Sequence, residues 1–162
     1  MRLAVAAVGR KGPFDAATGD YLDRAAKTGR ALGLTGPTLS AVEAPRALSG
    51  AARQAKEADL LDAAPPDGAR VVLLDEGGEA MASRALASLI ARERDAGASA
   101  LAFVIGGADG FAPAFRDALR PRSVATVAFG RATWPHMLVR LMLAEQLYRA
   151  ATILSGHPYH RN

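Results

Sequence analysis

Short, wholly apolar runs alternate with longer amphipathic stretches along the chain, and this alternation constrains the fold more than any other feature. Residues 3–8, 71–74 and 101–105 contain only apolar side chains. Strands this apolar are buried on both faces, which is typical of a parallel sheet covered by helices. Strands separated by helices also imply right-handed crossovers. We therefore predict an α/β protein with helices on both sides of a parallel sheet, in a single domain over residues 1–162.

The expected elements follow one another in regular order. Strands are expected at residues 3–8, 38–42, 71–74, 101–105 and 124–129, and helices at 14–32, 48–62, 81–95, 113–119 and 136–154. No apolar run is long enough to span a bilayer, and the first residues read as a buried strand rather than a signal peptide. The sequence contains no cysteine, which excludes disulfides and thiolate metal sites. We expect a cytoplasmic protein.

Three of the expected strands end in glycine-containing segments that can bind a ligand. These segments are residues 75–78, 106–110 and 129–136. Ligands of open parallel sheets bind beyond the carboxyl ends of the strands, and glycine lets the backbone approach them closely. The middle segment, Gly106-Gly107-x-x-Gly110, matches neither the dinucleotide fingerprint nor the phosphate loop, and alone it indicates only a turn. Together the three segments predict a binding site.

Positive charge is concentrated in the last third of the chain. Residues 1–115 are nearly neutral, whereas residues 116–162 carry seven arginines against only Asp117 and Glu145. Arginine binds phosphate through a planar fork and stacks on bases. A preference for arginine codons explains the scarcity of lysine but not this asymmetry. The distribution favours nucleic-acid binding.

The C-terminal residues 156–162 are unusually rich in functional side chains. Two histidines, a tyrosine and an arginine occur at His157, Tyr159, His160 and Arg161. Together they can stack on a base, hold a phosphate and move a proton. The two histidines are spaced for metal binding, but without cysteine or a nearby carboxylate we predict no metal site.

Four motifs resemble one family of methyltransferases. They are Phe103-Val-Ile-Gly-Gly-Ala-Asp-Gly110, Thr133-Trp-Pro-His-Met-Leu-Val-Arg140, Leu143-Ala-Glu-Gln-Leu-Tyr-Arg-Ala150 and His157-Pro-Tyr-His-Arg161. In this order they resemble the ribosomal RNA large subunit methyltransferase H family of the knotted SPOUT superfamily. The resemblance covers the whole chain. One departure is a longer segment between Gly106 and Pro135, with the extra residues expected near 120–123.

The resemblance implies a fold, a cofactor and a substrate. Members of the family use S-adenosyl-L-methionine to methylate N3 of a pseudouridine in helix 69 of the 23S rRNA, within the assembled 70S ribosome. They are homodimers with a trefoil knot near the C-terminus, and the cofactor lies in the knot. Matched position by position, their cofactor contacts correspond to Leu74, Gly106, Phe129, Gly130, Arg131, Ala132, Thr133 and Trp134.

Methylation of a pseudouridine imino group needs either a base that removes its proton or a cation that stabilises the anion. His136, His160, Tyr159 and Arg161 have suitable side chains, and we expect the last three to position the base, with His160 as a proton acceptor. His136 has either a structural or a substrate role.

Glu145 and Arg149 complete the predicted catalytic set. They are four residues apart on the last expected helix, in the order that favours an ion pair. On such an apolar helix we expect the pair to face a dimer partner or the active site.

Two other functions stay open. One is a knotted methyltransferase acting on tRNA or another rRNA base, and the other is a ribosome-associated RNA-binding dimer without catalysis. Cofactor binding separates the second from the enzymes, because a pure binder has no use for S-adenosylmethionine.

Overall fold

A computed structural model of the chain describes residues 1–10 and 12–159. Its sheet has the strand order β2-β1-β4-β3-β5, and every pair of neighbouring strands is parallel. The strands are β1 (Arg2–Val8), β2 (Thr35–Val42), β3 (Arg70–Ala80), β4 (Ala100–Ile105) and β5 (Ser123–Ala128). The predicted parallel sheet is confirmed, and the trefoil knot stays a prediction.

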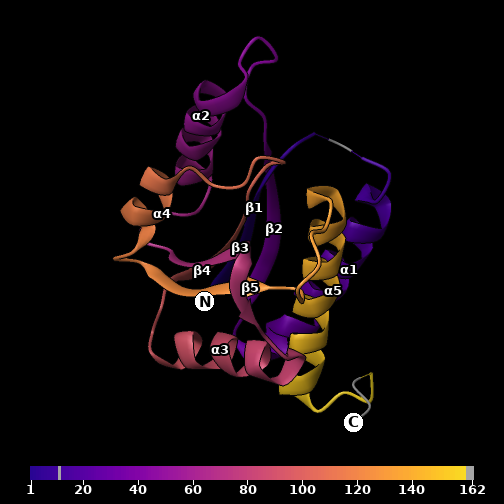
Figure 1. The fold of residues 1–162 in the computed structure, drawn as a ribbon. Helices are drawn as coiled ribbons and strands as arrows, with labels where there is room; N and C mark the ends of the chain where they lie inside the picture. The colour runs from indigo at the N-terminus through magenta and orange to yellow at the C-terminus, as the bar shows by residue number, and fades with distance from the viewer. Residues whose placement is uncertain (11, 160–162) are drawn as a thin grey trace.

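Helices cover both faces of the sheet (Figure 1). They are α1 (Asp15–Gly29), α2 (Gly50–Ala63), α3 (Ser83–Asp95), α4 (Pro113–Leu119) and α5 (His136–Ser155), with a short 3-10 helix at Arg30–Leu32 after α1. Helices α1, α3 and α5 lie on one face, and α2 and α4 lie on the other. These positions agree with the predicted α/β architecture.

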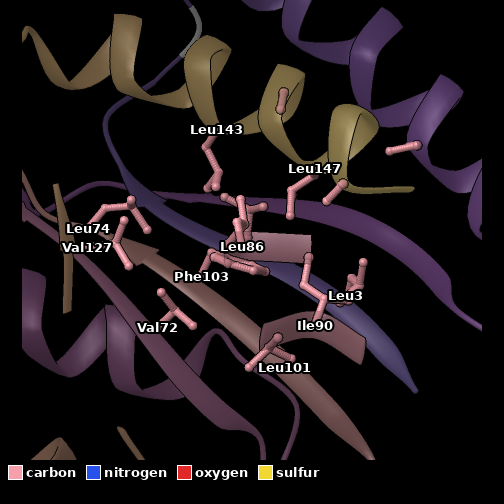
Figure 2. Packing of buried hydrophobic residues seen from close by; sticks show 14 of the residues in the cluster. Leu3, Val72, Leu74, Leu86, Ile90, Leu101, Phe103, Val127, Leu143 and Leu147 are labelled. Atoms are coloured by element: carbon pink, nitrogen blue, oxygen red, sulfur yellow. The ribbon is translucent and has the colours of Figure 1, made fainter. Parts of the chain in front are cut away.

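Successive residues of the central strands supply two separate cores, because side chains of a strand alternate between its faces. Val72 and Phe103 belong to the larger cluster, which also contains Leu143 and Leu147 of α5 (Figure 2). Val71 belongs to the second cluster, beneath α2 and α4. This double burial explains why the strands are apolar at every position.

Strand β3 does not end where the sequence predicts. We expected it to end at Asp75, but it continues to Ala80. Leu74 and Glu79 both pair with Val127 of β5, so the four residues between them bulge out of the ladder. Gly78 makes this possible, because a Cβ atom there would lie 2.7 Å from the main chain of Val127. The prediction of a simple strand end was therefore wrong.

Helix α5 closes the described chain and matches its predicted bounds to within one residue. It begins directly after Pro135 and ends at Gly156, whose φ of 69° is the left-handed conformation that favours glycine. Its buried residues pack on the sheet, and its neighbour in space is α1 (Figure 1). No helix among the described residues is both long and apolar enough to span a membrane.

Candidate active site

A cavity of about 700 Å³ opens at the carboxyl ends of β4 and β5 and at the bulge that follows the buried part of β3. Its walls come from residues 74–76, 105–111, 127–130 and 132–136, with Arg116 of α4 and Val139 of α5. Each of the three segments expected to bind a ligand contributes to this lining. The structure therefore brings together the strand ends singled out in the sequence.

Most of the residues expected to bind the cofactor line this cavity. They are Leu74, Gly106, Phe129, Gly130, Ala132, Thr133 and Trp134. Arg131 lies on the same segment and is exposed, but it is not part of the lining. The roles of all eight residues in binding stay predictions.

The glycine-rich turn is held in a tight shape. Gly110 donates its N–H to the carbonyl oxygen of Gly107 at 3.1 Å, and its φ is 70°. A Cβ atom at Gly106 would lie 3.3 Å from the ring of Phe111, so even a small side chain would crowd that ring. Glycine thus favours the turn at both positions, by leaving room at 106 and by its positive φ at 110.

The segment after β5 is fixed by two side-chain hydrogen bonds. The indole N–H of Trp134 donates to the carbonyl oxygen of Phe129 at 2.9 Å, and the hydroxyl of Thr133 donates to Glu76 at 3.0 Å. Trp134 nevertheless keeps 42% of its surface exposed, at the cavity wall. The second bond joins the segment to the β3 bulge, so the bulge and this segment share one rigid wall.

The cavity lining combines three carboxylates with one guanidinium, those of Asp75, Glu76, Asp109 and Arg116. Arg116 lies 2.6 Å from Asp75. The Asp109 carboxylate is paired with Arg53 of α2, which lies outside the lining. Among the described residues, Glu76 is therefore the lining carboxylate without an arginine partner. Asp75 and Glu76 were expected at a strand end, but the pairing of Arg116 with Asp75 was not, because no local pattern links the two.

His136 is the candidate catalytic residue that lies at the cavity. Its imidazole is partly buried and has no hydrogen-bond partner among the described residues. Burial lowers the pKa of His136, and the nearby Arg140 guanidinium lowers it further. The ring is therefore uncharged at neutral pH and has a nitrogen lone pair that can accept a proton.

Arg140 joins the start of α5 to the end of β1. Its side chain is 3% exposed and donates to the carbonyl oxygens of Val8 and Gly9, each at 2.6 Å. Gly9 has a φ of 110°, and a Cβ atom there would lie 2.9 Å from Nε2 of His136. The imidazole therefore occupies space that only a glycine at position 9 leaves open. The role of Arg140 was not predicted, because its partners are main-chain atoms at the other end of the sequence.

Tyr159, Glu145 and Arg149 form a second cluster near the C-terminal end of α5. The phenol hydroxyl of Tyr159 donates to Glu145 Oε1 at 3.2 Å, and Arg149 donates twice to the same oxygen, at 2.9 and 2.5 Å. The guanidinium of Arg149 also lies over the Tyr159 ring. Burial, aided by hydrogen bonds with Tyr21 and Glu145, raises the pKa of Tyr159 to about 12. His160 and Arg161 lie outside the described residues.

The second cluster and the cavity occupy different parts of α5. His136 begins the helix at the cavity. Glu145 lies nine residues further on, which is roughly 13 Å along the helix axis, and Tyr159 bonds it from beyond the C-terminal end of α5. Neither Glu145, Arg149 nor Tyr159 is part of the cavity lining. Within one chain, the described part of the tail therefore does not meet the residues expected to bind the cofactor.

Comparison with known proteins places the chain in a family. Residues 1–160 match the family described as "Predicted SPOUT methyltransferase". Proteins named ribosomal RNA large subunit methyltransferase H from Paracoccus denitrificans and Rhizobium rhizogenes are 53% and 50% identical to this chain, each over 99% of both chains. A crystal structure of ribosomal RNA small subunit methyltransferase E from Neisseria gonorrhoeae, bound to S-adenosyl methionine, is 12% identical with a TM-score of 0.45. It aligns over 95% of this chain and 66% of its own. On its family match and full-length relatives, the chain belongs to the SPOUT methyltransferases, within the ribosomal RNA large subunit methyltransferase H family.

Proposed function

We propose that this single-domain protein methylates N3 of a pseudouridine in helix 69 of the large-subunit rRNA, within the assembled ribosome. The observation that carries the proposal is the cavity at the ends of β4 and β5 and at the β3 bulge. It is formed by the segments that match the family's cofactor motifs, in a chain about half identical to its named relatives over the full length. An rRNA substrate would place the protein in the cytoplasm.

S-adenosylmethionine is the methyl donor of SPOUT methyltransferases, and the residues of the cavity fit it. A volume of about 700 Å³ lies within the usual range for a site that holds a ligand of this size. The cofactor has a sulfonium and an ammonium group, and the Glu76 carboxylate, which has no arginine partner among the described residues, complements these cations. Leu74, Ile105 and Val127 supply apolar surface for a base. When bound, the cofactor supplies an electrophilic methyl group.

The protein must then align the nucleobase and remove its imino proton. His136 suits the second task, because it lies at the cavity and is uncharged at neutral pH. Tyr159 is unsuited to accept the proton, since a phenol with a pKa of about 12 keeps its own proton at neutral pH. Its ring instead offers a surface on which a base can stack. His160 and Arg161 stay candidates for proton transfer and anion stabilisation.

We further propose that the active enzyme is a homodimer in which the tail of one chain completes the cavity of the other. Tyr159, Glu145 and Arg149 do not line the cavity of their own chain, which supports this arrangement. Leu138, Leu141 and Met142 are partly exposed at helical spacing on α5. Such an apolar stripe suits contact with a second copy of the chain.

The test is methyl transfer from tritium-labelled cofactor to purified ribosomes that carry the pseudouridine. Ribosomes with plain uridine at the same position are the control. We expect label in the large-subunit rRNA of the first sample only, recovered as N3-methylpseudouridine after digestion. Equal labelling of the uridine control, or of tRNA, would indicate another substrate. Cofactor binding without transfer to any RNA would contradict the enzymatic proposal.

A further inference from the structure

Helix α2 contacts the glycine-rich 106–110 loop, although α2 contributes no residue to the cavity lining. Gln54 donates its side-chain N–H to the main-chain carbonyl oxygen of Asp109 at 2.7 Å. Arg53 forms an ion pair with the Asp109 carboxylate. Two neighbouring side chains of α2 thus bind one residue of the loop, through both its main chain and its side chain.

Glu57, one helical turn further along α2, contacts the same loop at a second point. It is 8% exposed, and a Cβ atom at Gly107 would lie 2.7 Å from its Oε2. Burial raises the pKa of Glu57, Arg53 opposes the shift, and the Asp109 carboxylate adds to it. Arg53 Nε lies 3.7 Å from Glu57 Oε1. One guanidinium therefore sits between a buried carboxylate and a carboxylate of the loop.

Burial of the Glu57 carboxylate lowers the stability of the fold, so we infer that its contact with the loop serves a function. A buried charge destabilises a protein unless it is paired. An apolar residue at position 57 would fill the same space without the free-energy cost of removing a charge from water. The loop contains three glycines in five residues, so fixing its backbone costs more conformational entropy than fixing most segments. A loop already held in its binding shape avoids that cost when a ligand arrives.

We propose that Arg53, Gln54 and Glu57 are positioning residues that hold the 106–110 loop in the shape required for cofactor binding. The proposal rests on the proposed function, because it takes this loop to contact S-adenosylmethionine. The three side chains act through Asp109 and Gly107 and touch neither cofactor nor RNA. They tune the affinity for the cofactor and leave the methyl-transfer step unchanged.

The experiment compares Gln54→Ala and Glu57→Gln with the wild-type protein. Each variant should bind S-adenosylmethionine roughly threefold to tenfold more weakly by calorimetry. Gln54→Ala removes the hydrogen bond to Asp109, and Glu57→Gln removes the charge that pairs with Arg53. The KM for the cofactor should rise by the same factor, with kcat at saturating cofactor and the KM for ribosomes unchanged. Hydrogen exchange of the loop amides should be faster in the cofactor-free variants.

Asp62→Asn is the matched control, since Asp62 lies on the same helix and pairs with Arg122 instead of the loop. It should keep the wild-type affinity for the cofactor and the wild-type loop exchange. Arg53→Lys, which keeps a cation, should lose less affinity than Arg53→Ala. Unchanged affinity in all loop-contacting variants would overturn the proposal, as would a loss of kcat that follows a lowered melting temperature. Failure of the wild-type protein itself to bind the cofactor would instead overturn the proposed function, while loop exchange would still report whether α2 holds the loop.

Discussion

Single residues at the cavity combine chemical and steric roles that the sequence only partly reveals. The motif around Gly106 could be recognised in the sequence, because a glycine directly after a predicted strand indicates a turn that a ligand can approach closely. His136 was open between a structural and a substrate role, and both stay predictions, because it packs against Gly9 and also lies at the cavity. The contact of Arg140 with the end of β1 joins residues more than 130 positions apart, and no local pattern reports such a pairing.

Gly106→Val should abolish detectable binding of S-adenosylmethionine, because the added side chain would displace Phe111 or the turn at Gly110. Isothermal titration calorimetry measures the loss, and a near-native circular dichroism spectrum would show that the fold persists. Gly19→Ala is the control, since Gly19 lies in α1 and a Cβ atom added there would have no neighbour within 4 Å. Undiminished affinity in Gly106→Val would remove this loop from the cofactor site.

The pH dependence of the reaction should report His136. If its neutral imidazole accepts the proton, the single-turnover rate rises with pH and levels off above the pKa of His136. Because burial and Arg140 lower that pKa, the inflection should lie below the ordinary value of about 6.5. His136→Gln should lose this inflection and most of the rate. An unshifted profile in His136→Gln would assign the proton transfer to another group, with His160 of the tail as the next candidate.

At the level of elements, the sequence predicts the order of the five strands and five α-helices, because apolar periodicity and Pro or Gly boundaries are local signals. The 3-10 helix at Arg30–Leu32 was expected as part of the first helix. The β3 bulge was not predicted, because it depends on contacts between residues far apart in the sequence. Its continuation to Ala80 depends on the register with Val127 and on the space that Gly78 leaves for β5. Pairing of this kind is decided by the neighbouring strand.

Two leucines of α5 should respond very differently to truncation. Leu147→Ala should lower the free energy of unfolding by about 2–5 kcal/mol, because Leu147 is 1% exposed within the main core. Leu141→Ala should cost the isolated chain far less, since Leu141 is partly exposed. Chemical denaturation at low protein concentration measures both values. Equal losses of unfolding free energy in the two variants would mean that Leu141 is already buried within one chain.

On the scale of the whole molecule, the cavity and the Tyr159 cluster are two separate groups of residues. Glu145, Arg149 and Tyr159 do not line the cavity, and Glu145 lies roughly 13 Å along α5 from His136. The sequence predicted both groups of residues but not their separation, which depends on where the tail packs on α5. If the tail of one chain completes the cavity of the other, the two groups of residues meet in the dimer. This arrangement makes a prediction that a site within one chain does not.

Two inactive variants should therefore restore activity when mixed. One lacks residues 159–162 and keeps its cavity, and the other carries Gly106→Val and keeps its tail. After joint refolding, each mixed dimer should hold one intact site, giving about a quarter of the wild-type activity at equal mixing. Each variant alone should be inactive, and light scattering should give about twice 16.8 kDa for the wild-type protein. No recovery in verified mixed dimers would place the whole site within one chain.

The bond from Arg140 to Val8 also bears on how the protein is made. The first strand is synthesised first, yet its carboxyl end acquires these contacts only when the last helix is present. Residues 127–136, which supply much of the cavity wall, also come late in translation. A nascent chain cannot complete its cavity until nearly all of it has left the ribosome. We therefore expect chains released before α5 to bind no cofactor, so that incomplete products are inert towards the RNA on which they were made.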